Sequence, residues 1–248
     1  MRGDRVNAID HRTITDRDFL LGSVWEGTGE ELHTNRYAAA RAMYGQRVLS
    51  GISGMLVALH THDPALLWTR QDVEWSFDGP IFEGATVRIE SGAVTGGRCF
   101  HLSQDDSLRG RGRVGVAGAP GHPPEDGRIS RGRTMTGADT GLLAHWLPPV
   151  DAPSPGSVPW PVLLLTASGL VVRDKLPGAF ELVLNRWLRW TQLADVRADD
   201  TVHCIVGLPA VRPSRTRPDL SVTRLEVHMI DSVSNKPVGH IDWVMVCR

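Results

Sequence analysis

Two short patterns in this sequence contain residue types that could bind a metal ion or a cofactor. His60, His62 and Asp63 could offer metal ligands, but the histidines stand at the predicted end of a helix, where they point to different sides, and no cysteine or third histidine accompanies them. The segment from Gly110 to Gly115 satisfies the dinucleotide pattern G-x-G-x-x-G, yet a Gly/Pro-rich stretch follows it rather than a helix. There is no G-x-S-x-G elbow and no reactive-cysteine signature. We therefore expect no cofactor and no metal.

The composition excludes several classes of partner. The 248 residues carry 27 Lys+Arg against 28 Asp+Glu, so the net charge of -1 gives no general field for a polyanion, and no nucleic-acid partner is expected. No apolar run approaches the roughly 18 to 20 residues that span a bilayer, and the N-terminus has no apolar segment typical of a signal peptide. Three cysteines, scattered and odd in number, imply no disulfide framework. We expect a cytoplasmic protein with no membrane partner.

Internal repetition indicates how the chain is organised. The segment Arg12-Thr-Ile-Thr15, followed by Asp18, recurs 121 positions later as Arg133-Thr-Met-Thr136, followed by Asp139. Three more matches recur 115 positions later, and they are Ser53 with Ser168, Trp75 with Trp190, and Thr86 with Thr201. Matches in the same order at two nearby offsets indicate a duplication. We predict one unit at residues 1–117, a Gly/Pro-rich linker at 118–132 and a second unit at 133–248.

The periodicity of apolar residues predicts the same elements in both copies. In the first copy, a helix-favouring stretch at residues 35–43 precedes a second predicted helix, which Ser50 caps and which runs from Gly51 to about residue 60. Alternation then predicts strands at 73–77, 86–94 and 98–103. In the second copy, a predicted helix at 162–173 precedes alternating strands at 182–190, 225–229 and 241–245. Each copy should therefore place a helix on one face of an antiparallel sheet, with Trp75, Trp190 and Trp243 in the core.

Three blocks of the first copy resemble a known family. They are His33-Thr-Asn-Arg-Tyr37-Ala-Ala-Ala, Gly45-Gln-Arg-Val-Leu-Ser-Gly51 and Trp75-Ser-Phe-Asp-Gly-Pro80-Ile-Phe-Glu-Gly84-Ala-Thr-Val87. Their order and spacing are similar to those of the MaoC-like, (R)-specific enoyl-thioester hydratases, in which a D-x-N-P-x-H motif, a glycine that opens the central helix and a P-V-x-x-G-D-x-L turn follow one another. The resemblance implies an α+β fold, a tandem hot dog in which each antiparallel sheet wraps a central helix. Two such units join edge to edge into one sheet, which removes an exposed edge from each.

The resemblance also implies an activity and a site. The activity is that of a hydratase or dehydratase, a lyase that adds or removes water at the 2,3-double bond of an acyl thioester on coenzyme A or acyl carrier protein. His33 matches the family's catalytic histidine and would be the acid/base, whereas its residue type alone indicates only a surface histidine at a helix start. Gly51 matches the glycine that opens the central helix, and its backbone N–H would donate to the thioester oxygen. Ser50 and Tyr37, next to these residues, are expected to bind substrate.

One departure from the family pattern concerns the catalytic carboxylate. The family's aspartate, five positions before the histidine, is Thr28 here, and Glu30 and Glu31 hold its Asn and Pro positions. Threonine cannot act as a carboxylate base. A shifted loop could bring Glu30 or Glu31 into the aspartate's place, since two glycines in this stretch permit it. Alternatively, His33 works alone while Thr28 holds a water or a substrate hydroxyl, and the glutamates, Glu26 included, are solvated loop charges.

The second copy has no comparable histidine, since only His145 lies in the corresponding region. We therefore expect one active site per chain, with the second copy shaping the acyl pocket, and a homodimer of tandem units. The resemblance implies a place in fatty-acid, polyketide or other secondary metabolism. Some arginines could meet the phosphates of coenzyme A or phosphopantetheine, although a solvated loop is the favoured interpretation for them: Arg111, Arg113, Arg128, Arg131 and Arg133. Two alternatives remain, a repurposed hot dog enzyme (isomerase, cyclase or thioesterase) and a non-catalytic acyl-binding or partner subunit.

Overall fold

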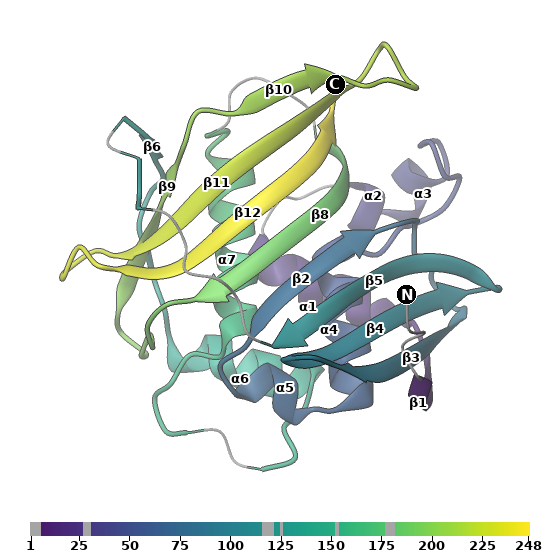
Figure 1. Cartoon of the computed structure of the whole chain (residues 1–248), viewed down its shortest axis with the longest axis horizontal. Helices are drawn as coiled ribbons and strands as arrows, with labels where there is room; N and C mark the ends of the chain where they lie inside the picture. Colours follow the sequence, from purple (N-terminus) through teal and green to yellow (C-terminus); the bar gives the residue numbers. More distant parts are fainter. Residues whose placement is uncertain (1–5, 27–30, 116–121, 125, 152–153, 177–181) are drawn as a thin grey trace.

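A twelve-stranded antiparallel sheet crosses the part of the protein that the structure, a computed structural model, describes: residues 6–26, 31–115, 122–124, 126–151, 154–176 and 182–248 (Figure 1). The first half of the chain contains β1 (Val6–Thr13), α1 (Asp16–Glu26), α2 (Glu31–Thr34), α3 (Arg36–Ala39), α4 (Gly51–His62), α5 (Ala65–Trp68), β2 (Asp72–Phe77), β3 (Thr86–Val94), β4 (Gly97–Gln104) and β5 (Ser107–Gly115). The second half contains β6 (Arg128–Ile129), β7 (Arg133–Thr134), α6 (Gly137–Trp146), α7 (Trp160–Arg173), β8 (Leu182–Gln192), β9 (Thr201–Val206), β10 (Ala210–Pro213), β11 (Ser221–Asp231) and β12 (Pro237–Cys247).

Within the sheet, the two halves meet at the pair β2 and β8. The strand order is β1-β3-β4-β5-β2-β8-β12-β11-β9-β6, with β10 also on β11 and β7 also on β9. The junction is β2 against β8, where Trp75 faces Leu188 and Val73 faces Trp190. The predicted edge-to-edge sheet is therefore confirmed.

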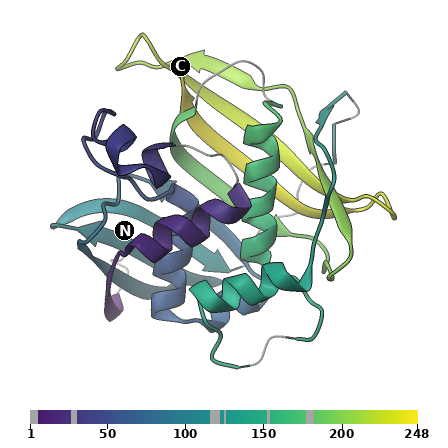
Figure 2. The same ribbon diagram turned by 180° about the vertical axis from the view of Figure 1, so that it is seen from behind.

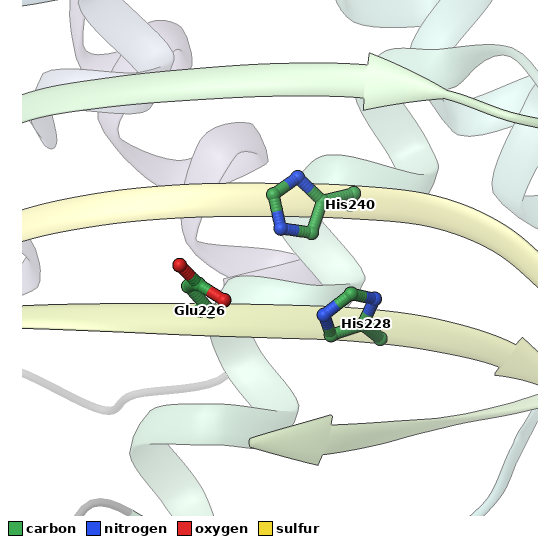
Figure 3. Close-up of side chains that lie close together, drawn as sticks. All are labelled: Glu226, His228 and His240. Atoms are coloured by element: carbon green, nitrogen blue, oxygen red, sulfur yellow. The ribbon is translucent and has the colours of Figure 1, made fainter. Parts of the chain in front are cut away.

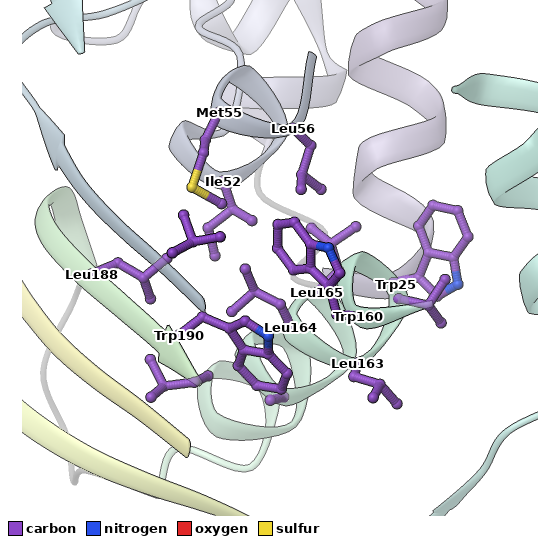
Figure 4. Close-up of a cluster of buried hydrophobic side chains, with 14 of the residues drawn as sticks. Trp25, Ile52, Met55, Leu56, Trp160, Leu163, Leu164, Leu165, Leu188 and Trp190 are labelled. Atoms are coloured by element: carbon purple, nitrogen blue, oxygen red, sulfur yellow. The ribbon is translucent and has the colours of Figure 1, made fainter. Parts of the chain in front are cut away.

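One long helix covers each half of the sheet. Seen from behind, α4 and α7 lie on the same face of the sheet, and α1 and α6 cross them (Figure 2). The helix predicted from Gly51 is α4, and its apolar residues Met55, Leu56 and Leu59 are inaccessible to solvent. The core includes residues of α1, α4, α7 and β8 (Figure 4). The three tryptophans predicted in the core, Trp75, Trp190 and Trp243, are at most 1% exposed.

The sequence repeat corresponds to a repeat of contacts. Ser53 and Ser168 lie in the two long helices, α4 and α7. The threonines at the start of β3 and β9 each meet a threonine at the end of a paired strand. Thr86 of β3 meets Thr13 of β1 at 3.0 Å, and Thr201 of β9 meets Thr134 of β7 at 2.8 Å, between the Oγ1 atoms. The tandem architecture, with each antiparallel sheet around a helix, is thus confirmed. The predicted linker at 118–132 lies partly outside the described residues, and Arg128–Ile129 within it form β6, paired with β9.

Several elements differ from those predicted. The helix expected at residues 35–43 is only α3, because the chain turns away after Ala40. The segment from Gly110 to Gly115 lies in strand β5 and not at a helix start, and its glycines make room for a neighbouring ring. A Cβ on Gly112 would lie 2.3 Å from the Cε3 atom of Trp75. Among the described residues, no helix is both long and apolar enough to cross a membrane.

Candidate functional site

A cavity of about 260 Å³ opens beside the N-terminus of α4. The cavity is surrounded by residues before and in α4, by residues of β2, β4 and β5, by the turn after β2, and by three residues of β8. Its lining is mostly apolar, as is usual for a site that takes a small organic ligand. The polar or charged side chains among the described lining residues are those of His33, Tyr44, Asp78, Arg109, Asn185 and Arg186. Both halves of the chain thus contribute to one cavity.

The chain before α4 is fixed by backbone bonds to the turn region after β2. Leu49 N–H donates to the carbonyl oxygen of Ile81 at 2.8 Å, and Val48 forms an isolated bridge with Phe82. A buried arginine, Arg47, adds ion pairs to Glu83 at 2.7 Å and to Asp16. The Arg36 and Arg47 guanidinium groups lower the pKa of the Glu83 carboxyl by hydrogen bonding. These contacts hold the start of α4 in a fixed position beside the cavity.

His33 lies half-buried in the short helix α2 and lines the cavity. Its Nδ1 atom lies 2.5 Å from the carbonyl oxygen of Val48. A carbonyl oxygen only accepts, so Nδ1 carries the hydrogen in this contact. In the neutral ring the basic lone pair is then on Nε2, which is the atom suited to take up or return a proton.

Gly51 opens α4 and also lines the cavity. Its Cα approaches its neighbours so closely that a Cβ would lie 2.9 Å from the Phe77 ring and 3.3 Å from Nδ2 of Asn185. Ser50, at the N-cap, makes no side-chain capping bond, because its hydroxyl donates to Oε1 of the buried Glu26 at 2.6 Å. The positive end of the helix dipole therefore faces the cavity without a capping side chain.

Asn185 of β8 brings a second donor to the same place. Its Oδ1 accepts the indole N–H of Trp243 at 3.0 Å, and Trp243 is only 1% exposed. Since the oxygen is held by the indole, the amide NH₂ is the end that lies near Gly51. The side chain therefore offers N–H groups beside the start of α4.

Two further charged groups face this cavity. Arg109 lies over the Phe82 ring at 5.7 Å, and its buried Nε has no hydrogen-bond partner among the described residues. The Asp78 Oδ1 lies 3.5 Å from the guanidinium of Arg111. Asp78 is the one carboxylate among the described lining residues.

A second groove, of about 660 Å³, shares Phe77, Asp78, Leu184 and Arg186 with this cavity. It runs over β12 and the chain before β11, and five arginines line it: Arg111, Arg186, Arg212, Arg215 and Arg217. Arg217 pairs with Asp219 at 2.9 Å, and Arg111 pairs with Asp78. The groove therefore carries a positive excess next to the cavity.

The structure brings some of the predicted site residues together. His33 and Gly51 line one cavity, whereas Ser50 is not among its lining residues and its hydroxyl donates to Glu26. Tyr37 is 82% exposed in α3 and is not among the lining residues. Glu31 is exposed at the start of α2. Thr28 and Glu30 lie outside the described residues.

Some expectations for charged residues need correction. Glu26 is not a solvated loop charge, because it ends α1 with 5% of its surface exposed. Among the arginines weighed as phosphate ligands, Arg131 and Arg133 pair with Asp174 and Asp139, and only Arg111 lines the groove.

Asn185 and Arg109 were not predicted as site residues. The sequence held one signal for Asn185, a lone amide inside an apolar alternating strand. Arg109 carried none, since it stands in a segment rich in glycine and arginine.

Comparison with solved structures supplies the fold. No protein-family profile and no curated protein sequence matches the chain. A MaoC domain protein from Chloroflexus aurantiacus superposes with a TM-score of 0.72 at 10% identity, over 99% of this chain and 95% of that one. A conserved hypothetical protein from Mycobacterium tuberculosis, described as a double hotdog, gives 0.69 at 12% identity over 100% and 97%. A MaoC-like dehydratase from Phytophthora capsici gives 0.60 at 8% identity over 96% and 95%. The chain therefore has the double hot dog fold of the MaoC-like dehydratases, and the resemblance seen in its sequence is confirmed as one of fold.

Proposed function

We propose that this protein is a hydratase or dehydratase of acyl thioesters, with His33 as the acid/base and the Gly51 backbone N–H as a donor to the thioester oxygen. The observation that carries the proposal is that His33 and the start of α4 face one cavity. A histidine and helix N-terminal N–H groups are the two kinds of group that this reaction needs. The fold, shared with MaoC-like dehydratases, supports the same assignment.

The reaction can be written with these groups. Water attacks C3 of the 2-enoyl thioester and gives a proton to Nε2 of His33, while negative charge develops on the thioester oxygen. Gly51 N–H and the Asn185 amide stabilise that charge, and the proton returns to C2. The reverse sequence removes water from the 3-hydroxyacyl thioester. Fixed donors are effective here because they need no reorganisation as the charge forms.

Asp78 is the carboxylate that we assign to orienting the attacking water. It lines the cavity with His33, whereas Glu31 is exposed to solvent. A carboxylate hydrogen-bonded to the attacking water would orient it toward C3.

The arginine-lined groove is proposed to hold the phosphate-bearing part of the thioester carrier. Arg186 lies in both the cavity and the groove, so a chain that enters the cavity would pass it. Guanidinium groups bind phosphate through paired N–H donors. The cavity is slightly smaller than the 300 Å³ at the low end of ordinary ligand sites, which favours a short acyl group.

The test is an assay of the full chain with a four-carbon 2-enoyl thioester of coenzyme A and of pantetheine. Two readouts are followed together, loss of the conjugated double bond and release of free thiol. The proposal predicts loss of the double bond with no thiol release, and a lower KM for the coenzyme A thioester. Release of thiol at an equal or greater rate would indicate a thioesterase, and binding without either change would indicate an acyl-binding protein.

The Asn185 donor is tested by Asn185→Ala, which should lower kcat by about a hundredfold, the scale for one oxyanion donor. Trp243→Phe keeps the amide and removes the hydrogen bond to Oδ1. It should lower kcat by less, with KM unchanged. Equal activity in Asn185→Ala and the wild type would exclude this donor.

A further inference from the structure

The outer face of the second half of the sheet carries a cluster of metal-binding side chains. His228 on β11 lies directly opposite His240 on β12 in the strand register. Glu226 stands two positions before His228, and alternate residues of a strand share a face. Their neighbours Val227, Ile241 and Trp243 point into the core instead. The three side chains therefore meet on the face turned away from α7 (Figure 3).

The ligand atoms of this cluster are close enough to share one ion. One imidazole nitrogen from each histidine and one carboxylate oxygen lie within 4.8 Å of one another. The two rings are 4.7 Å apart between centroids and tilted by 52°, so they do not stack face to face. Small side-chain rotations would bring these atoms to the spacing of ligands around a Zn²⁺ ion, whose bonds to nitrogen and carboxylate oxygen are about 2.0 to 2.2 Å long.

The buried histidines lack the hydrogen bonds that such groups normally make. His228 has no solvent exposure, and neither its Nδ1 nor its Nε2 has a hydrogen-bond partner among the described residues. The Nε2 of His240, which is 8% exposed, also has none. Buried polar atoms are nearly always satisfied, so three such nitrogens in one place need an explanation. A bound metal ion would coordinate one nitrogen of each ring, and so would satisfy two of these three atoms.

Burial and neighbouring charged groups act on both rings. Burial, and then the neighbouring His240, lower the pKa of His228 to about 4. Burial also lowers the pKa of His240, while Asp242 opposes this shift and Arg189 adds to it. Asp242 itself is engaged by Arg224, which leaves Glu226 as the carboxylate for the ion.

We propose that Glu226, His228 and His240 bind one divalent transition-metal ion, of which Zn²⁺ is the best match to two imidazoles and one carboxylate. Glu226 is exposed, so an ion can enter from solvent, and a water molecule would complete four-coordination. The ion would link β11 to β12 on the face opposite to the core. It lies apart from the cavity at His33, and the proposal does not depend on the thioester chemistry. No metal was expected from the sequence, in which these two histidines stand twelve positions apart.

The experiment uses the full chain, freed of metal with a chelator and then titrated calorimetrically with Zn²⁺ alone. The matched control is His203→Gln, a histidine of β9 on the same outer face, with its Nδ1 on Ser232 and outside the cluster. Glu226→Gln changes only the exposed ligand, and His240→Gln removes a buried one. Each variant's fold is checked by circular dichroism before titration.

The expected result is one Zn²⁺ per chain in the wild type and in His203→Gln, and a rise of the melting temperature with Zn²⁺. Affinity should fall by at least tenfold in Glu226→Gln and further in His240→Gln. Co²⁺ should give a visible absorption spectrum that these two variants lose. Equal Zn²⁺ affinity in the wild type and Glu226→Gln, or no binding by the folded wild type, would overturn the proposal. If His240→Gln does not fold, Glu226→Gln alone decides the outcome.

Discussion

Trp25 and Trp146 stack across the two halves of the chain, with ring centroids 6.2 Å apart. Each indole N–H donates to the aspartate of the other repeat at 3.0 Å, Trp25 to Asp139 and Trp146 to Asp18. Each aspartate is also paired with the arginine six positions before it. The residues that revealed the repeat in the sequence therefore lock the two copies together.

Trp25→Phe should destabilise the protein by about 2 kcal/mol, because it removes a buried hydrogen bond to a charged group and leaves Asp139 with one donor fewer. The free energy of unfolding from urea titration measures the effect. Trp187→Phe is the control, since its indole donates to Glu74 at an exposed site. An equal, small loss in both variants would mean that the reciprocal bonds contribute little.

Gly112→Ala should destabilise the protein by about 1 to 3 kcal/mol, the range for overpacking a core. The new Cβ would lie 2.3 Å from the Trp75 ring and 2.4 Å from the Glu74 carbonyl oxygen. Gly141→Ala, in helix α6 with nothing within 4 Å of its Cβ position, should instead stabilise by about 0.5 to 1 kcal/mol. Thermal unfolding should show a lower melting temperature for Gly112→Ala and a higher one for Gly141→Ala. An unchanged melting temperature in Gly112→Ala would contradict the close contact between Gly112 and Trp75.

The sequence predicted some elements of the fold and missed others. The long helices and most core strands were predictable, because their apolar residues recur with clear periods. Helix α1 was missed because it buries polar residues such as Asp18 and Glu26, which break its apolar pattern. Strand β5 was missed because Gly110 and Gly112, where an apolar side chain would be expected, leave room for Trp75 of the neighbouring strand β2. The part of the site from β8 depends on the pairing of β2 with β8, a contact between residues more than a hundred positions apart.

The metal-free protein should lose stability as the pH falls from about 6.5 to about 4. Over this range His228 takes up a proton in the unfolded chain. In the native protein the pKa of His228 is about 4, so the ring stays neutral there. Because the unfolded chain binds more protons, a lower pH favours unfolding. The full effect is about 3 kcal/mol below pH 4. Urea titrations across this range, with His228→Gln for comparison, measure it. The variant should show a shallower pH dependence, and identical slopes would exclude His228 as the cause.

The carboxylate of the reaction can be located by three separate substitutions. Asp78→Asn should lower kcat for hydration by about a hundredfold, because the attacking water loses the carboxylate that orients it. Glu31→Gln should change kcat little, because Glu31 is exposed. Glu30→Gln tests the remaining candidate, and a large loss there with full activity in Asp78→Asn would assign the role to Glu30.

Thr28→Asp, which restores the family's residue, should raise the rate of hydration of a simple 2-enoyl thioester.

The most direct test of His33 as the acid/base is the kcat of His33→Gln for hydration of the four-carbon 2-enoyl thioester. The Kd for a non-reactive saturated thioester is measured with the same variant. If His33 transfers the proton, kcat falls by about a hundredfold or more while the Kd changes little, because the rest of the cavity lining is intact. A His33→Gln protein that keeps the wild-type kcat would contradict the assignment of His33 and of this cavity as the catalytic site.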